Sequence, residues 1–176
     1  MSHVDSLLLR NKAFAETDAK DHVPEIPFIP HQLSFVITCV DPRTEPGAFL
    51  GVELGDAIVL RSIGGRVTPA VLRDVAYISY LLETKAPDGP WFELAVIHHT
   101  DCGSGFLADE QLRHGFAQRG FDEDALAKLP VTDPEQTVRT DVDLLRKDSR
   151  VSSRIAVSGH VYDVATGLVR TVVEAG

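Results

Sequence analysis

The stretch LSFVITCVDPR, residues 33–43, begins with a nearly continuous run of apolar and small residues. Such a run is typical of a strand that is buried on both faces of a sheet. The run leads to Cys39, and Asp41 and Arg43 follow at alternate positions. The chain has only one other cysteine, in VIHHTDCG (residues 96–103), and it also follows an apolar run. This pattern predicts a buried strand whose end carries reactive side chains.

Outward from this strand, further strands alternate with helices. The runs GDAIVLRSI (55–63) and WFELAVIH (91–98) predict two more buried strands, and residues 154–173 predict a pair of strands joined by a turn. Helices are predicted over 69–85 and 133–148, which open with Thr-Pro and Asp-Pro start signals. Shorter helical pieces are predicted over 3–18 and 107–128. The alternation predicts an α/β fold, with a mostly parallel central β-sheet flanked by helices on both faces and a C-terminal antiparallel strand pair.

The first 32 residues differ from the rest. The segment DHVPEIPFIPHQ, residues 21–32, carries three prolines, which remove helix hydrogen bonds and favour an extended chain. We therefore expect an N-terminal helix and Pro-rich arm over residues 1–32, and a single α/β domain over residues 33–176.

The length, net charge and composition of the chain argue against several classes of protein. The chain has 176 residues, which suits one domain with its own core. Its net charge of −9 would repel a phosphate backbone, so a nucleic-acid partner is not expected. No run approaches the roughly 18–20 apolar residues that span a bilayer. We see no secretory signal, and two cysteines without one indicate a reducing, cytoplasmic location.

The ends of two predicted strands carry a candidate metal site. In open α/β sheets, ligands bind outside the carboxyl ends of the strands. If the first and third strands are neighbours, Cys39, His99 and Cys102 can converge on one point. Two thiolates and one imidazole suit Zn²⁺ with one position left open. Asp41 could fill that position or stand beside it, and Arg43 could hold the Asp41 carboxylate as a bidentate partner.

Simpler interpretations exist for each residue. A buried cysteine is usually a small apolar side chain, and the two cysteines could form a disulfide. His98 and His99 could be a surface pair. We expect His98 to point away from its neighbour and to serve in packing or to support the residues around the site. Asp41 and Arg43 could be an ordinary ion pair. The coincidence of all these residues at two strand ends favours the metal site.

The segments CVDPR (39–43) and HHTDCG (98–103) resemble the C-x-D-x-R and H-x-x-C motifs of the β-class carbonic anhydrases. GDAIVLRSIGGRVT (55–68) and SGHVYDVATGLV (158–169) resemble two further segments of that family, in the same order. The resemblance covers roughly residues 33–173.

The resemblance implies a role for each matched residue. It implies one Zn²⁺ per subunit held by Cys39, His99 and Cys102, with Asp41 and Arg43 as the catalytic pair that gates the metal. It also implies that Gly103, lying tightly beside the metal, and Ser62, Ile63 and Gly64 form the pocket or support the residues around the metal. The 33–176 domain would then be a zinc-binding catalytic domain, and the smallest working unit would be a homodimer, often paired into a homotetramer. No nucleic acid or membrane partner is implied.

The implied activity is reversible hydration of CO₂ to bicarbonate. The chain departs from the usual family pattern at Pro42 and in RSIGG, residues 61–65. These departures resemble a compact branch that includes carbonyl sulfide hydrolases, so the alternative activity is conversion of carbonyl sulfide and water to H₂S and CO₂. A lesser alternative is a non-catalytic zinc-binding module, against which the intact Asp41–Arg43 pair argues.

Overall fold

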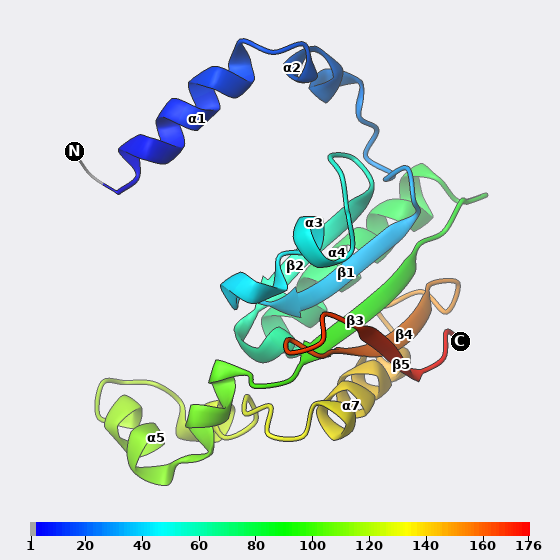
Figure 1. Ribbon diagram of the computed structural model, residues 1–176. Coiled ribbons are helices and arrows are strands. Elements are labelled where there is room, and N and C mark those ends of the chain that lie inside the picture. Colours follow the sequence, from blue (N-terminus) through cyan, green and yellow to red (C-terminus); the bar gives the residue numbers. More distant parts are fainter. Residues whose placement is uncertain (1–2) are drawn as a thin grey trace.

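The computed structural model describes residues 3–176, and residues 1 and 2 of the predicted arm lie outside the described part. Five strands form one sheet in the order β2-β1-β3-β4-β5 (Figure 1). Strands β2, β1, β3 and β4 pair in parallel, and β5 pairs antiparallel with β4. The strands are β1 (Ser34–Cys39), β2 (Ala57–Ser62), β3 (Glu93–His99), β4 (Ala156–Tyr162) and β5 (Val169–Val173). The predicted mostly parallel sheet with a C-terminal antiparallel pair is confirmed.

The strand order reverses at β1. The chain passes from β1 to β2 on one side and then crosses to β3 on the other side. In the register of the parallel pair, Ile37 of β1 lies opposite Val96 of β3. The carboxyl ends of the two strands therefore flank the point where such sheets open a crevice. The first and third predicted strands are therefore neighbours, which is the condition on which the predicted metal site depended.

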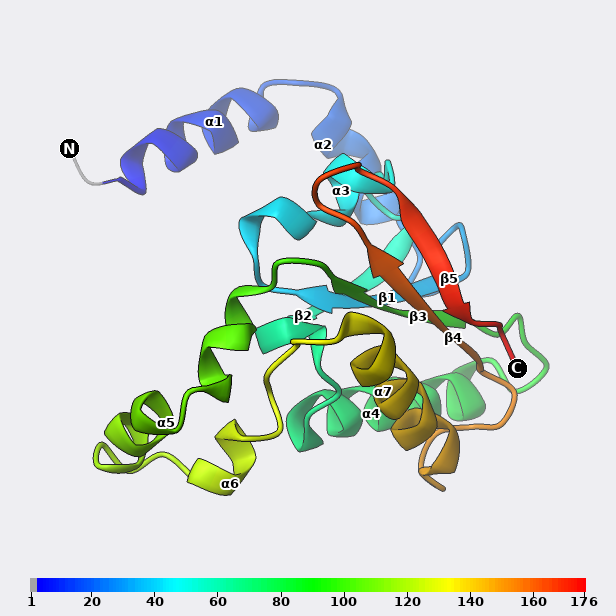
Figure 2. The ribbon, with the colours of Figure 1, turned by 60° about the horizontal axis from the view of Figure 1, so that its bottom comes forward.

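The two long helices cover the same face of the sheet. Helix α4 (Pro69–Lys85) and helix α7 (Pro134–Lys147) lie side by side there, and the single turn α3 (Pro46–Phe49) lies on the other face (Figure 2). The Thr68 hydroxyl caps α4 and the Asp133 carboxylate caps α7, as their start signals predict. Helices therefore lie on both faces of the sheet, as predicted, but α3 on the second face is a single turn.

The main core lies between the sheet and these two helices. Burial of each large apolar side chain there stabilises the fold by about 1.5–3 kcal/mol. The core contains alternate residues of β1, β3 and β4 and one stripe from each helix: Phe35, Ile37, Leu94, Val96, Val157, Val161, Val71, Val75, Leu82, Val138, Val142 and Leu145.

Strand β2 differs from its prediction. The sequence indicated a buried strand, but β2 is at the edge of the sheet and most of its residues are only half-buried. An edge strand has one neighbour, and the helices cover the centre of the sheet more fully than its margin. An apolar run alone does not separate these two positions.

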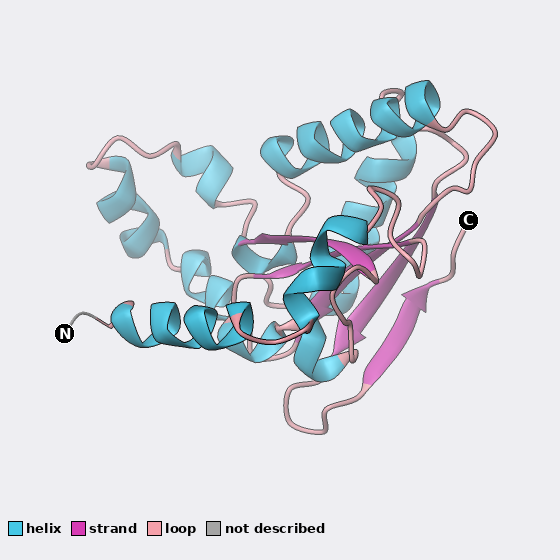
Figure 3. Ribbon diagram, turned by 90° about the horizontal axis from the view of Figure 1, so that it is seen from above, coloured by secondary structure: helices cyan, strands magenta, loops and turns pink. Residues whose placement is uncertain are grey.

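The N-terminal segment stands away from the sheet (Figures 1 and 3). It consists of α1 (Asp5–Ala15), α2 (Ala19–His22) and the short 3₁₀ helix η1 (Val23–Glu25), so the predicted helix over 3–18 is shorter at both ends. The start of the arm, residues 21–25, is helical where the prolines predicted an extended chain, because Pro24 takes an early position in a 3₁₀ turn, where a missing N–H costs no hydrogen bond. Helix α1 buries none of its residues, and Leu7, Leu8 and Leu9 are each more than half exposed.

A second segment projects from the end of β3. It contains the 3₁₀ helix η4 (Gly103–Ala108), α5 (Glu110–Ala117) and α6 (Glu123–Leu126), which confirms the prediction of helical pieces over 107–128. Across residues 3–176, none of the helices combines the length and the apolar character that a membrane span requires.

Candidate metal centre

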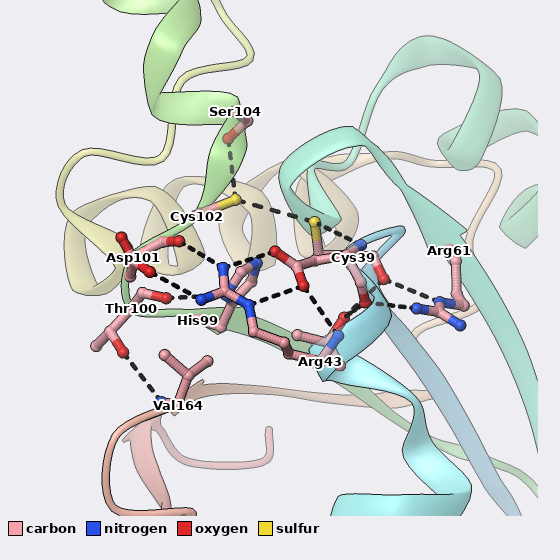
Figure 4. Close-up of polar contacts among 11 residues, drawn as sticks. Cys39, Arg43, Arg61, His99, Thr100, Asp101, Cys102, Ser104 and Val164 are labelled. Atoms are coloured by element: carbon pink, nitrogen blue, oxygen red, sulfur yellow. Dashed lines mark hydrogen bonds and ion pairs between the residues drawn. The ribbon is translucent and has the colours of Figure 1, made fainter.

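Three side chains from the ends of β1 and β3 meet in one buried cluster (Figure 4). Cys39 ends β1, His99 ends β3, and Cys102 lies in the turn that follows. Their potential ligand atoms all lie within 4.8 Å of one another, and each residue is at most 9% exposed. The structure thus brings together the three residues that the sequence singled out as metal ligands.

The spacing of the two sulfur atoms suits a shared metal ion. Cys39 Sγ lies 3.9 Å from Cys102 Sγ, and both cysteines are free. A disulfide bond would require about 2.05 Å, so the disulfide that the sequence left open is not formed. Two thiolates that bind one tetrahedral Zn²⁺ at about 2.3 Å lie roughly 3.8 Å apart. The distance fits zinc.

His99 offers one ring nitrogen to this cluster. Its Nδ1 lies 2.9 Å from the Thr100 carbonyl oxygen, so we assign the ring proton to Nδ1, which donates to that oxygen. The other nitrogen, Nε2, is buried and has no hydrogen-bond partner. A backbone carbonyl that fixes the tautomer in this way is the usual support for a metal-ligating histidine. The donor set of two sulfurs and one imidazole, with a fourth position left open, fits a catalytic zinc site.

Without a metal, the two thiols share one proton. The hydrogen bond from Cys39, helped by the one from Ser104, outweighs burial and lowers the pKa of Cys102 to about 4. The same Cys39–Cys102 bond, together with burial, raises the pKa of Cys39. A bound dication displaces the remaining proton, so metal binding is coupled to proton release.

Asp41 and Arg43 form a close pair beside the cluster. In the turn η2 (Pro42–Thr44), the Arg43 backbone N–H donates to Asp41 Oδ1 at 2.9 Å. Arg43 Nε also donates to Oδ1, at 3.0 Å, and a terminal nitrogen donates to Oδ2 at 2.8 Å. These bonds lower the pKa of Asp41 to about 2, so its carboxylate is ionised at neutral pH. The carboxylate is held by Arg43 and is not one of the three clustered ligands.

Comparison with known proteins adds to this geometry. A solved carbonic anhydrase from Streptococcus mutans superposes with a TM-score of 0.77 at 36% identity, and the match covers 98% of both chains. Beta-carbonic anhydrase 1 of Mycobacterium tuberculosis is 28% identical over 142 residues, covering 81% of this chain and 83% of that protein. A carbon disulfide hydrolase from Acidianus sp. is 26% identical over 160 residues, covering 77% and 75%.

The chain belongs to the β-carbonic anhydrase family. It matches no family model in a scan of protein families, so the assignment depends on these relatives and on the shared fold.

In this member of the family, an apolar cavity of about 320 Å³ opens beside Cys39 and Asp41. Ile63 and Gly64 of the 3₁₀ turn η3 (Ile63–Gly65), two of the residues that the resemblance implied for the pocket, form part of its wall. The remaining wall is formed by Val40, Gly103, Ser104, Phe106, Leu107, Leu112 and Phe116. Apart from Asp41, no charged side chain among the described residues lines this cavity.

The other two residues implied for the pocket are Gly103 and Ser62. Gly103 lines the cavity, and a Cβ added there would meet no protein atom within 4 Å. Ser62 does not line the cavity, because its hydroxyl donates to the Arg66 carbonyl at 2.9 Å and braces the turn.

His98 points away from the cluster, as the alternation of the strand predicts. It is fully buried against α7, where Nδ1 lies 2.8 Å from Thr137 Oγ1. Its Nε2 lies 3.2 Å from Asp141 Oδ2, and Arg66 forms a bidentate pair with the same carboxylate. The alternative of a surface histidine pair is therefore wrong, and the packing role is confirmed.

Sequence reasoning missed three residues that contact the site. Ser104 accepts from the Val131 N–H, so its own proton is available to Cys102 Sγ at 3.2 Å. Arg61 donates to the backbone carbonyls of Cys39 and Asp41, and Asp101 accepts from Arg43. Asp101 lies within the quoted H-x-x-C motif, and Arg61 lies at the end of an apolar strand, so both positions carried a signal.

Proposed function

We propose that this protein is a zinc-dependent carbonic anhydrase that reversibly hydrates CO₂ to bicarbonate. The observation that carries the proposal is the buried Cys39–His99–Cys102 cluster beside the Asp41–Arg43 pair at an apolar cavity. A purely structural zinc site closes with a fourth protein ligand. Here the three clustered side chains would leave one position of a bound zinc open, and the ionised Asp41 carboxylate lies beside them at the cavity.

Each residue around the proposed metal site has a separate role in the reaction. Bound zinc supplies a Lewis acid that makes hydroxide available from water at neutral pH. We propose that Asp41 accepts a hydrogen bond from the attacking water and directs its lone pair toward the substrate carbon. Arg43 fixes the direction of the Asp41 carboxylate through two parallel hydrogen bonds. We propose that a backbone N–H near Gly103 donates to the distal atom of the substrate as it gains charge.

The cavity wall suits a small, linear, uncharged substrate. Its side chains are mostly aliphatic or aromatic, so the transfer of an apolar molecule from water into the cavity costs little free energy. Ile63 is 46% exposed and Phe106 is 75% exposed, so both stand at the mouth where a substrate would enter.

The same cavity favours a second candidate activity. Carbonyl sulfide carries a larger and more polarisable sulfur atom, and an apolar wall that includes Ile63 and Phe106 accepts it. Attack of water on its carbon gives H₂S and CO₂ by the same sequence of proton transfers. The carbon disulfide hydrolase relatives support a test of carbon disulfide as well. The third reading, a non-catalytic zinc-binding module, predicts no turnover of any of these molecules.

The deciding experiment compares substrates on one zinc-loaded preparation at matched pH. The ratio of kcat/KM for carbonyl sulfide, as H₂S release, to that for CO₂, as proton release, is expected to lie well below one. A ratio near or above one would assign the protein to carbonyl sulfide hydrolysis. No turnover of CO₂, carbonyl sulfide or carbon disulfide would contradict both enzymatic readings.

A variant links the activity to the cluster. Cys39→Ser removes one of the two thiolates, and we expect it to abolish activity and to lower the zinc content measured by elemental analysis. His99→Ala should do the same. Full activity in zinc-free Cys39→Ser protein would contradict the assigned ligands.

We further propose a homodimer, or a tetramer of such dimers, in which residues 1–32 form an arm that packs on a second subunit and residues 33–176 form the catalytic domain. The exposed Leu7, Leu8 and Leu9 of α1 support this proposal, because such a cluster is normally covered. A cytoplasmic location is proposed on the two free cysteines.

A further inference from the structure

Arg43 is held by a second carboxylate, that of Asp101. A terminal nitrogen of Arg43 donates to Asp101 Oδ2 at 2.8 Å, and the other donates to the Asp101 carbonyl oxygen, also at 2.8 Å (Figure 4). With its two bonds to Asp41, the Arg43 guanidinium uses four of its five N–H groups. Asp41 follows β1 and Asp101 follows β3. Arg43 therefore joins the two loops that lie next to Cys39 and Cys102.

The chain contains an internal reference for this arrangement. Asp148 and Arg150 repeat the Asp-x-Arg spacing, and they form the same three bonds at 2.9, 2.9 and 2.7 Å. The Asp41–Arg43 pair forms them at 2.9, 3.0 and 2.8 Å. The pairing of Asp with Arg is thus a local property of the three-residue motif. Within residues 3–176, Arg150 is in contact with no second carboxylate, so the Asp101 contacts distinguish the site.

The backbone of Asp101 adopts an uncommon conformation. Its φ of +53° lies in the left-handed region, which Asp tolerates better than most non-glycine residues. In this conformation one residue offers both its carbonyl oxygen and its carboxylate to Arg43. The Asp101 side chain is 79% exposed, and ion pairs at such exposure contribute little to folding stability. Placement of the guanidinium accounts for the arrangement better than stability does.

We propose that Asp101 is a positioning residue, which fixes the Arg43 guanidinium and, through it, the Asp41 carboxylate relative to the three metal ligands. The proposal rests on the proposed function, in which Asp41 directs the attacking water. Without the Asp101 side chain, Asp41 and Arg43 remain paired, as Asp148 and Arg150 are, but the pair is then held by its own loop alone. The direction of the Asp41 carboxylate toward the substrate is then no longer fixed.

Two variants separate the carboxylate from the backbone. Asp101→Gly tolerates the positive φ and keeps the carbonyl contact, but it removes the side-chain acceptor. Asp101→Asn keeps an oxygen acceptor and also tolerates this φ. Asp148→Asn, at a side chain that is 15% exposed, serves as the control for loss of the carboxylate in the other Asp-x-Arg motif. Zinc content is measured in every variant and is expected to equal that of the wild type.

The first measurement does not depend on activity. The rate at which the Nε–H proton of Arg43 exchanges with water is measured by ¹H–¹⁵N NMR on zinc-loaded protein, with Arg150 as the internal reference. We expect Arg43 to exchange more slowly than Arg150 in the wild type. In Asp101→Gly the two rates should become similar, and Asp101→Asn should lie between. An unchanged Arg43 rate in Asp101→Gly would overturn the proposal.

The second measurement is a double-mutant cycle on kcat/KM for the preferred substrate. Asp101→Gly should lower kcat/KM by about tenfold, since a small misplacement of a positioning group has effects of this order. In an Arg43→Ala background the same change should have no further effect, because Asp101 then has nothing to position. An equal fall in both backgrounds would overturn the proposal. If the wild type turns over none of the three substrates, the proposed function fails, while the exchange rates still test the contact.

Discussion

Arg61 on the edge strand β2 holds the backbone of Cys39 on β1, with Nε donating to the Cys39 carbonyl oxygen at 2.9 Å. A terminal nitrogen of the same guanidinium donates to the Asp41 carbonyl at 2.7 Å, and Glu45 pairs with Arg61 on its outer side. One side chain thereby fixes two backbone groups, one in a metal ligand and one in the proposed catalytic carboxylate residue. The edge strand contributes to the site through this contact.

Replacement of Arg61 should loosen that backbone. In Arg61→Leu, two carbonyl oxygens lose a charged donor, and each such bond contributes about 1.5–3 kcal/mol when it is well shielded. Arg61 is 27% exposed, so we expect the free energy of unfolding in urea to fall by about 2 kcal/mol in total, together with weaker zinc retention against a chelator. Arg139→Leu, on the exposed face of α7, is the control. Equal unfolding midpoints for both variants would contradict this role.

A methyl group at Gly65 should disrupt the turn beside the ligands. Gly65 has a φ of +69°, and its Cβ would lie 3.1 Å from the Ile97 carbonyl oxygen and 3.2 Å from the Cys39 nitrogen. These are backbone atoms of the central strands and have no room to move. Gly167 has a similar φ of +75° but open space around it. We expect Gly167→Ala to cost about 1–2 kcal/mol in unfolding free energy from strain alone, and Gly65→Ala to cost about 1–3 kcal/mol more from the close contacts. Similar losses in the two variants would contradict this account.

The buried carboxylate of Asp141 should make stability depend on pH. Burial alone would raise its pKa, but hydrogen bonds with His98 and Arg66 outweigh burial and lower it. A lowered pKa in the folded state means that the stabilisation is present above the ordinary value of about 3.9 and is lost as the pH falls through the folded value. In Asp141→Asn, the 12%-exposed Arg66 loses its anionic partner, which should cost about 3–5 kcal/mol at pH 7.

The pH dependence of this cost provides the check. Urea unfolding of zinc-free wild type and Asp141→Asn should differ by about 1 kcal/mol less at pH 3 than at pH 7, because pH 3 lies about one unit below the ordinary pKa of the unfolded carboxyl group. A difference that stays constant or grows between pH 7 and pH 3 would show that Asp141 does not act as an ionised partner in the folded protein.

If the arm joins two subunits, a disruptive substitution in α1 should lower the molar mass of the assembly in solution. Leu8→Asp places a charge among the exposed leucines of α1, and we expect light scattering to report a smaller assembly than for the wild type at the same micromolar concentration. Glu16→Asp, at the exposed end of α1, leaves the charge unchanged and serves as the control. A wild type that is monomeric would contradict the proposed dimer.

The candidate ligands could be predicted because each signal was local. Cys39 and His99 each end an apolar run, and parallel strands place such ends at one edge, so only the adjacency of β1 and β3 had to be assumed. The two main helices were predicted for the same reason, since Thr68 and Asp133 cap them from the adjacent sequence.

What could not be predicted depends on packing between distant segments. The edge position of β2 follows from strand order, which its composition does not encode. The open space beside Gly103 depends on the path of η4, and Ser62 braces a turn whose geometry only the fold defines. Asp101 lies within the HHTDCG motif, but its contact with Arg43 joins residues that are 58 positions apart in the sequence.

The two thiolate donors come from parts of the chain that are synthesised at different times. Cys39 and Cys102 are separated by 63 positions, and the second strand and helix α4 lie between them. During translation the first cysteine is therefore made well before the second, and the complete three-residue site exists only after β1 has paired with β3. Zinc uptake then reports that this long-range pairing has formed, so the rate of metal incorporation into nascent or refolding protein can be used to time the assembly of the central sheet.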